Sequence, residues 1–67
     1  MPKEEHIVAA ELHEKAAKSH RTVAEHYDNG GLDAANQESA EAYTHSLRAY
    51  AASKHAHEKS IHHKKHA

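Results

Sequence analysis

The chain has 67 residues, no cysteine, ten histidines and a formal net charge of −1 at pH 7. This length allows one domain, and without cysteine the chain has no disulfides, thiolate metal sites or thiol catalysis. The small net charge argues against general affinity for nucleic acid, and the lack of an apolar run of about 18 residues argues against a membrane span. Because the N-terminal residues also lack the pattern of a secretory signal, we expect a cytoplasmic protein.

The apolar residues are few for a chain that folds alone. Alanine supplies more than half of the 37 % hydrophobic residues. Fully burying a large aliphatic side chain stabilises a fold by roughly 1.5–3 kcal/mol, whereas ordering each residue costs about 1.5 kcal/mol. One copy therefore has almost no margin of stability, and we expect self-association as a homodimer.

Residues 3–28 are expected to form the first helix. No glycine or proline interrupts this range, and Pro2 is tolerated in the first turn of a helix. From Ala9 the sequence reads AAELHEK, AAKSHRT and VAEHYDN, which are three lines of seven residues. The fifth position of these lines is held by His13, His20 and Tyr27.

Asn29, Gly30 and Gly31 are expected to end this helix and turn the chain, because Asn and Gly adopt left-handed backbone conformations at little cost. A second helix is expected over about residues 32–63. It overlaps a basic, histidine-rich tail at residues 54–67, which carries four lysines, five histidines and one glutamate.

The second helix also repeats every seven residues, in the lines ANQESAE, AYTHSLR, AYAASKH and AHEKSIH. Small residues hold equivalent positions in these lines: Ala35, Ala42, Ala49, Ala56, Ser39, Ser46, Ser53 and Ser60. A period of seven is typical of helices that supercoil about a partner, and small side chains let two helix backbones approach closely. Because the turn is short, we predict an all-α, antiparallel helical hairpin with an Ala/Ser seam, meaning the face along which the two helices touch.

Bulky side chains beside this seam are expected to lie where two hairpins meet. They are Leu12, Tyr27, Tyr43, Leu47, Tyr50 and Ile61. One two-helix hairpin encloses no core, whereas two hairpins enclose one as a four-helix bundle. The single domain, residues 1–67, is therefore predicted to dimerise into a four-helix bundle.

Two stretches resemble known helical hairpins. The segment AEHYDNGGLDAANQESAEAY is similar to the turn of a tetratricopeptide-type hairpin, in which a Tyr precedes a Gly-containing turn and alanines follow. The lines AAELHEKAAKSH and HSLRAYAASKHAHEKS resemble those of small Ala/His-rich helical-hairpin proteins of bacteria, a group without an assigned activity. The resemblance implies a helical hairpin and no particular function.

Histidine is the residue type here that could carry chemistry, since imidazole is a common ligand for Zn, Cu and Ni. His6, His13 and His20 repeat every seven residues, about 10.5 Å apart along a helix, which is too far for one ion to bridge. If the turn pairs residues whose numbers add up to about 62, His6 lies opposite His55 to His57 and forms a cross-helix pair with them. Alternatively, the three repeated histidines flank the seam half-buried and bond to a carboxylate or a serine hydroxyl. Two isolated histidines are expected to be solvated: His26 and His45.

The tail offers a second arrangement for a metal ion. Four of its residues, spaced by three, four and four, fall on one helical face. Two imidazoles four residues apart can clamp a divalent ion, with Glu58 as an oxygen ligand or hydrogen-bond acceptor. Alternatively, the tail is a solvated basic helix end that complements the helix dipole. The candidate metal ligands are His55, Glu58, His62, His66, His6 and His57.

No catalytic arrangement is evident, so we expect no enzyme. The segments HEKAA and HEKSI lack the second histidine of a zincin helix, and no Gly-rich phosphate loop is present. The first hypothesis is a small His-rich bundle that binds a divalent transition metal such as Zn, Ni or Cu as a buffer or sensor.

The alternative hypothesis is a non-enzymatic structural or interaction module with pH-sensitive self-association. Protonating the seam histidines would place like charges together and loosen the bundle below about pH 6. In a third hypothesis the basic tail docks on an acidic partner or nucleic acid, without the aromatic residues that base stacking needs. Neither a membrane nor a small-molecule substrate is expected as a partner.

Overall fold

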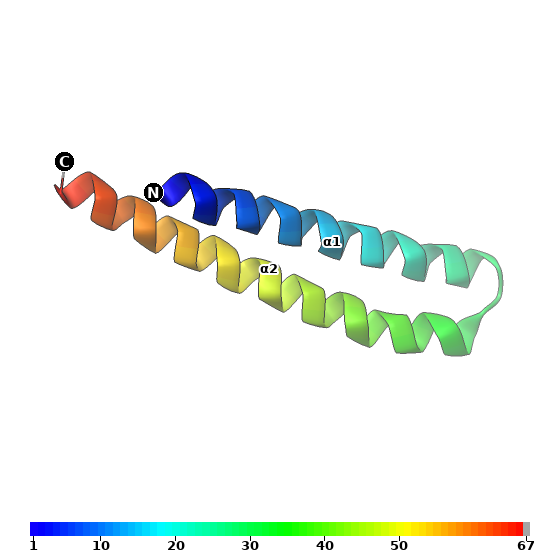
Figure 1. Cartoon of the computed structure of the whole chain (residues 1–67). Coiled ribbons are helices and arrows are strands. Elements are labelled where there is room, and N and C mark those ends of the chain that lie inside the picture. Colours follow the sequence, from blue (N-terminus) through cyan, green and yellow to red (C-terminus); the bar gives the residue numbers. More distant parts are fainter. Residues whose placement is uncertain (67) are drawn as a thin grey trace.

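A computed structural model of the chain describes residues 1–66, and the side chains of residues 1–62, as a hairpin of two helices (Figure 1). α1 spans Pro2–Asp28 and α2 spans Leu32–His66. The helices run antiparallel, and the C-terminal end of α2 extends past the N-terminus of α1 (Figure 1). The described residues contain no strand, which confirms the predicted all-α hairpin. α2 is three residues longer than the helix expected from the sequence.

The hairpin is a thin rod with a long dimension of 54 Å and cross-dimensions of 14 and 11 Å, measured over Cα atoms. Over the described residues, neither helix combines the length and hydrophobicity that a bilayer crossing requires. At the start of α1, the Met1 amino group lies 3.2 Å from a Glu4 carboxylate oxygen. Its hydrogen bond to that carboxylate, more than the other contacts, lowers the pKa of Glu4.

Three residues turn the chain between the helices. Gly30 has a φ of +78°, a conformation that costs glycine little and other residues more. The Gly31 N–H donates to the His26 carbonyl at 2.8 Å, and the Gly30 N–H donates to the Tyr27 carbonyl at 3.2 Å. This pair of bonds satisfies the last carbonyls of α1 in the pattern that commonly closes a helix before a left-handed glycine.

The interior of the hairpin consists of alanine. Every buried residue among those described is an alanine, and together they follow the predicted period of seven: Ala9, Ala16, Ala35, Ala42, Ala49 and Ala56. The four on α2 have no exposed surface. A methyl group occupies little space, so the two backbones lie close together along the whole seam.

Candidate functional site

Three histidine–serine hydrogen bonds run along one side of the seam. His6 Nε2 lies 2.8 Å from Ser60 Oγ, His13 Nε2 lies 2.6 Å from Ser53 Oγ, and His20 Nε2 lies 2.9 Å from Ser46 Oγ. We call these three pairs the His–Ser ladder. Each histidine comes from α1 and each serine from α2, so the ladder joins the helices at intervals of two turns.

The ladder agrees with one of the two interpretations of the repeated histidines, in which they bond to serine hydroxyls beside the seam. They are exposed rather than half-buried, whereas the serines are half-buried. The cross-helix metal pair does not form, because His6 is paired with Ser60 rather than placed opposite His55 to His57.

The direction of one ladder bond follows from its neighbours. The Ser46 hydroxyl donates to the Ala42 carbonyl at 3.0 Å, which commits its only proton. His20 Nε2 must therefore carry a hydrogen and donate it to Ser46 Oγ. This bond also persists when the ring is protonated, because both ring nitrogens are then donors.

Tyr27 occupies the next position of seven after His20, at the turn end of the ladder. Its hydroxyl donates to the Asn36 side-chain carbonyl at 3.2 Å, which again joins α1 to α2. The ring itself is 49 % exposed. A polar side-chain contact thus links the helices at four successive levels of the hairpin.

An exposed apolar surface lies beside the ladder. On α1, three alanines each lie four residues after a ladder histidine. On α2, Tyr43 and Tyr50 each lie three residues before a ladder serine, and Leu47 lies four residues after Tyr43, so both sets are on the ladder side. We call this surface the tyrosine flank; it consists of Ala10, Ala17, Ala24, Tyr43, Leu47 and Tyr50. The exposed fractions are 64 % for Tyr43, 50 % for Leu47 and 68 % for Tyr50.

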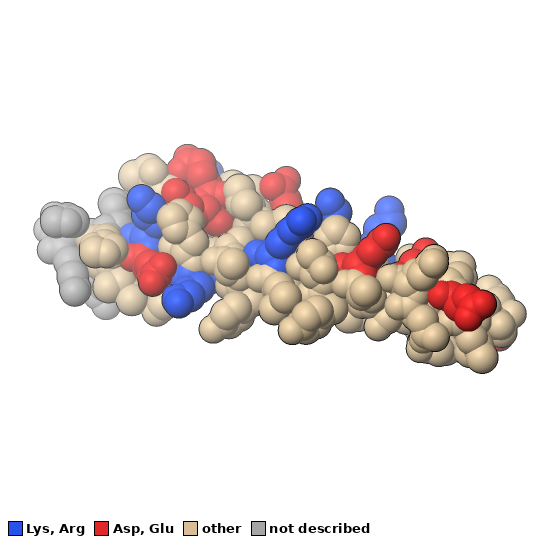
Figure 2. Space-filling model, turned by 90° about the horizontal axis from the view of Figure 1, so that it is seen from below, with Lys and Arg blue, Asp and Glu red and all other residues tan. Residues whose placement is uncertain are grey.

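The charged side chains are not distributed evenly around α2. In the view onto α2, the Lys, Arg, Asp and Glu side chains gather along one edge, and the middle of the opposite edge has none (Figure 2). This asymmetry matches the heptad pattern, in which most charged residues of α2 fall on a different side from Tyr43 and Tyr50; Lys54 is an exception, since it shares the heptad position of Leu47.

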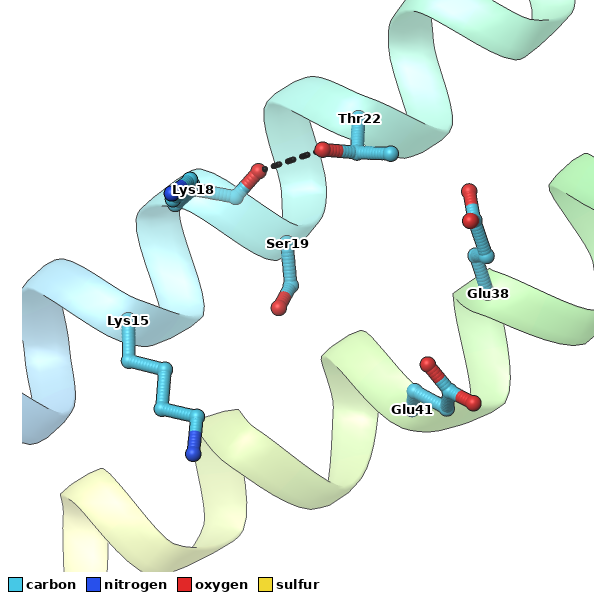
Figure 3. A pocket seen from close by; sticks show the side chains of 6 residues that line it. All are labelled: Lys15, Lys18, Ser19, Thr22, Glu38 and Glu41. Carbon is cyan, nitrogen blue, oxygen red and sulfur yellow. Dashed lines mark hydrogen bonds between the residues drawn. The ribbon is translucent and has the colours of Figure 1, made fainter.

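The other side of the hairpin is charged. Four charged side chains line a groove of about 330 Å³ between the helices (Figure 3): Lys15, Lys18, Glu38 and Glu41. Lysines come from α1 and glutamates from α2, so the charges of the groove compensate one another. The hydroxyl of Thr22, also in this groove, donates to the Lys18 carbonyl within α1.

The expectation for His26 was wrong. Its Nε2 lies 2.9 Å from Glu38 Oε2 on the charged side, and both side chains are about one-third exposed. No pattern in the sequence indicates this pair, because the two residues approach each other only after the chain has turned. His45 is half-buried and lines a shallow hollow with Glu41 and Arg48.

The predicted metal ligands of the tail are only partly brought together. His55, Glu58 and His62 line one hollow of about 390 Å³ on α2, and the His66 side chain lies outside the described residues. His57 is exposed. Among the described residues, no three His, Asp or Glu side chains are gathered in a way that could hold a metal ion.

His55 also faces α1. It lines a second hollow, of about 210 Å³, with Glu5 and Val8. The Glu5 Oε1 atom is shielded from solvent and has no hydrogen-bond partner among the described residues. A carboxylate oxygen and an imidazole therefore share this hollow.

Comparisons with known proteins return no relative: no family model, no curated protein and no solved structure matches the chain. The interpretation of function therefore depends on the geometry described above.

Proposed function

We propose that the chain is a non-enzymatic, self-associating module, in which the tyrosine flank of one hairpin packs against a second copy to form a four-helix bundle. The observation that carries this proposal is the separation of small and large apolar residues. Every buried residue of the described hairpin is an alanine, while Tyr43 and Tyr50 are about two-thirds exposed. A contiguous exposed apolar patch of this kind is typical of an interaction surface.

The composition of the flank also favours a protein interface. Tyrosine is enriched at the centre of interfaces, because it contributes a large apolar area and a hydroxyl with few rotatable bonds. The alanines of α1 provide a flat surface against which such rings can pack. A second hairpin would supply the enclosed core that one hairpin lacks.

Sedimentation of the full chain at neutral pH tests the proposal. We expect a dimer, and we expect Tyr50→Glu to raise its dissociation constant at least about 30-fold, since a central tyrosine contributes about 2 kcal/mol or more. Ala51→Glu is the matched control, because the neighbouring residue points about 100° away around the helix. A wild-type chain that remains monomeric at high concentration would refute the module.

As a second candidate function, we propose that the hairpin binds a divalent transition metal through His55. The supporting observation is that His55 lines two hollows that also contain carboxylates, Glu4 and Glu5 in one, and Glu58 beside Lys59 in the other. His62 lines the second hollow as well. Imidazole and carboxylate together suit Zn²⁺.

Calorimetric titration of the full chain with Zn²⁺ tests this second candidate. We expect His55→Ala to abolish stoichiometric binding and His45→Ala to leave it intact. The Glu4→Gln, Glu5→Gln double variant and Glu58→Gln then distinguish the hollows, since only the carboxylates of the occupied one contribute. Weak uptake of several ions that His55→Ala does not change would contradict a defined site.

A further inference from the structure

We propose that the two hairpins of the dimer pack with their turns at the same end, related by a twofold axis along the length of the rod. α1 of each copy then lies on α2 of the other. This inference rests on the proposed self-association and specifies its geometry. Two sets of residues, at the centre and at the edges of the flank, carry it.

At the centre, large residues lie level with small ones. The His13–Ser53 bond fixes the register of the two helices. Ala17, four residues after His13, is therefore level with Tyr50, three residues before Ser53, to within about one residue or 1.5 Å.

The next ladder bond repeats this relation one heptad closer to the turn. Ala24 lies four residues after His20 and Tyr43 lies three residues before Ser46, so the His20–Ser46 bond brings Ala24 level with Tyr43. The flank therefore has a stripe of alanines on α1 at the heights where α2 carries tyrosines.

A twofold axis along the rod places the tyrosines of each copy over the alanines of the other. The rotation keeps each residue at its height and exchanges the sides occupied by α1 and α2. Tyr50 of the second copy then lies over Ala17, and its Tyr43 lies over Ala24. Each large ring meets a small side chain, in the manner of two surfaces that interdigitate.

The edges of the flank are complementary under the same rotation. Glu14 follows the ladder residue His13, and Lys54 follows its partner Ser53, so the two lie within about two residues of the same height. Within one hairpin they are on opposite outer edges. In the proposed dimer, Glu14 of one copy faces Lys54 of the other, and opposite charges meet at two places.

The apolar edge residues match in the same way. Ile7 and Ile61 follow the ladder partners His6 and Ser60, and they are 47 % and 40 % exposed. The rotation brings Ile7 of one copy against Ile61 of the other. At these two levels, apolar residues meet apolar residues and opposite charges meet each other, whereas at the His20–Ser46 level Arg21 of one copy meets Leu47 of the other.

The reverse orientation lacks this complementarity. With the turns at opposite ends, α1 lies on α1 and α2 on α2. The exposed tyrosines then face tyrosines, and the alanine stripe faces alanines. Large residues would collide on one half of the interface and small ones would leave gaps on the other.

Cysteine cross-linking distinguishes the two orientations, and the absence of native cysteine makes the experiment clean. We expect Glu14→Cys and Lys54→Cys chains to form a mixed disulfide when combined and neither chain to cross-link with itself. Self-linking of Glu14→Cys would indicate α1 on α1 and overturn the geometry. Glu41→Cys, in the charged groove on the other side of the hairpin, is the control for random collisions.

Charge reversal is the second measurement. Glu14→Lys should raise the dimer dissociation constant about tenfold, because two attractions become two repulsions at the rim. The Glu14→Lys, Lys54→Glu double variant should restore the wild-type value. A dimer that neither forms the mixed disulfide nor shows this restoration refutes the orientation and leaves self-association standing, whereas a monomeric wild-type chain refutes both.

Discussion

At the residue scale, the turn depends on one glycine and not on its neighbour. Gly30 is in the left-handed region at φ +78°, and a Cβ there would meet nothing within 4 Å, so the constraint lies in the backbone conformation. At Gly31 no such conformation is present, and a Cβ would make ordinary contacts of 3.6 Å with His26.

These two glycines give a matched pair of substitutions. Gly30→Ala should lower the free energy of unfolding by about 1 kcal/mol, because the left-handed region is costly for a residue with a Cβ. Gly31→Ala should leave that free energy unchanged or raise it slightly, since alanine restricts the unfolded chain more. Urea denaturation at one protein concentration measures both, and equal effects would show that the turn conformation is not the determinant.

At the element scale, the alanines of α2 set the distance between the helices. Ala42 and Ala49 have no exposed surface and lie beside the ladder serines. A larger side chain at these positions would push α1 away and lengthen the histidine–serine bonds next to it. The seam therefore couples the packing of the helices to their polar contacts.

Ala49→Leu tests this coupling. We expect it to lower the free energy of unfolding by about 1–3 kcal/mol, as overpacking of a tight interior does. Ala51→Leu, two residues along on the exposed outer side of α2, should have an effect close to zero. Denaturation of both variants at equal concentration gives the difference, and an Ala49→Leu chain as stable as Ala51→Leu would contradict a close-packed seam.

At the scale of the whole molecule, the proposed dimer places both His–Ser ladders at its interface. Among residues 1–62, the charged side chains and the further histidine that share this side, at the edges and ends of the flank, are Lys3, Glu14, Arg21, Asp28, Asp33, Lys54 and His57. Without the histidines, the acidic and basic charges balance. Each protonated ladder histidine therefore adds positive charge in excess of the acidic groups described on this side.

The dimer should for this reason weaken as the pH falls. We expect a higher dissociation constant at about pH 5.5 than at about pH 7.5, because protons added to the ladder histidines would place like charges together at the interface. Replacing the ladder histidines together by glutamine, which still donates to serine, should remove most of this change: His6→Gln, His13→Gln and His20→Gln. Sedimentation at the two pH values measures it, and an equal pH response in both chains would place the sensitivity elsewhere.

The sequence by itself determined the two helices, the turn and the contact face. These follow from local chemistry: uninterrupted helix formers, Asn-Gly-Gly between them, and alanine and serine every seven residues. Each of these features depends on residues a few positions apart or on a repeat within one helix. For the repeated histidines the sequence left two interpretations open, a metal pair across the helices or hydrogen bonds to a carboxylate or a serine hydroxyl, and the contacts between the helices decided for the serines.

The register, in contrast, was decided only by the tertiary structure. The prediction that facing residues of the two helices have numbers adding up to about 62 was wrong, since the ladder pairs His6 with Ser60. A helical side chain leans toward the N-terminus of its own helix. In antiparallel helices, contacting residues are therefore offset from the simple mirror pairing about the turn, so that the α2 partner lies farther along than that pairing predicts. The same offset moved His6 away from His57, and the approach of the two helices brought His26 to Glu38.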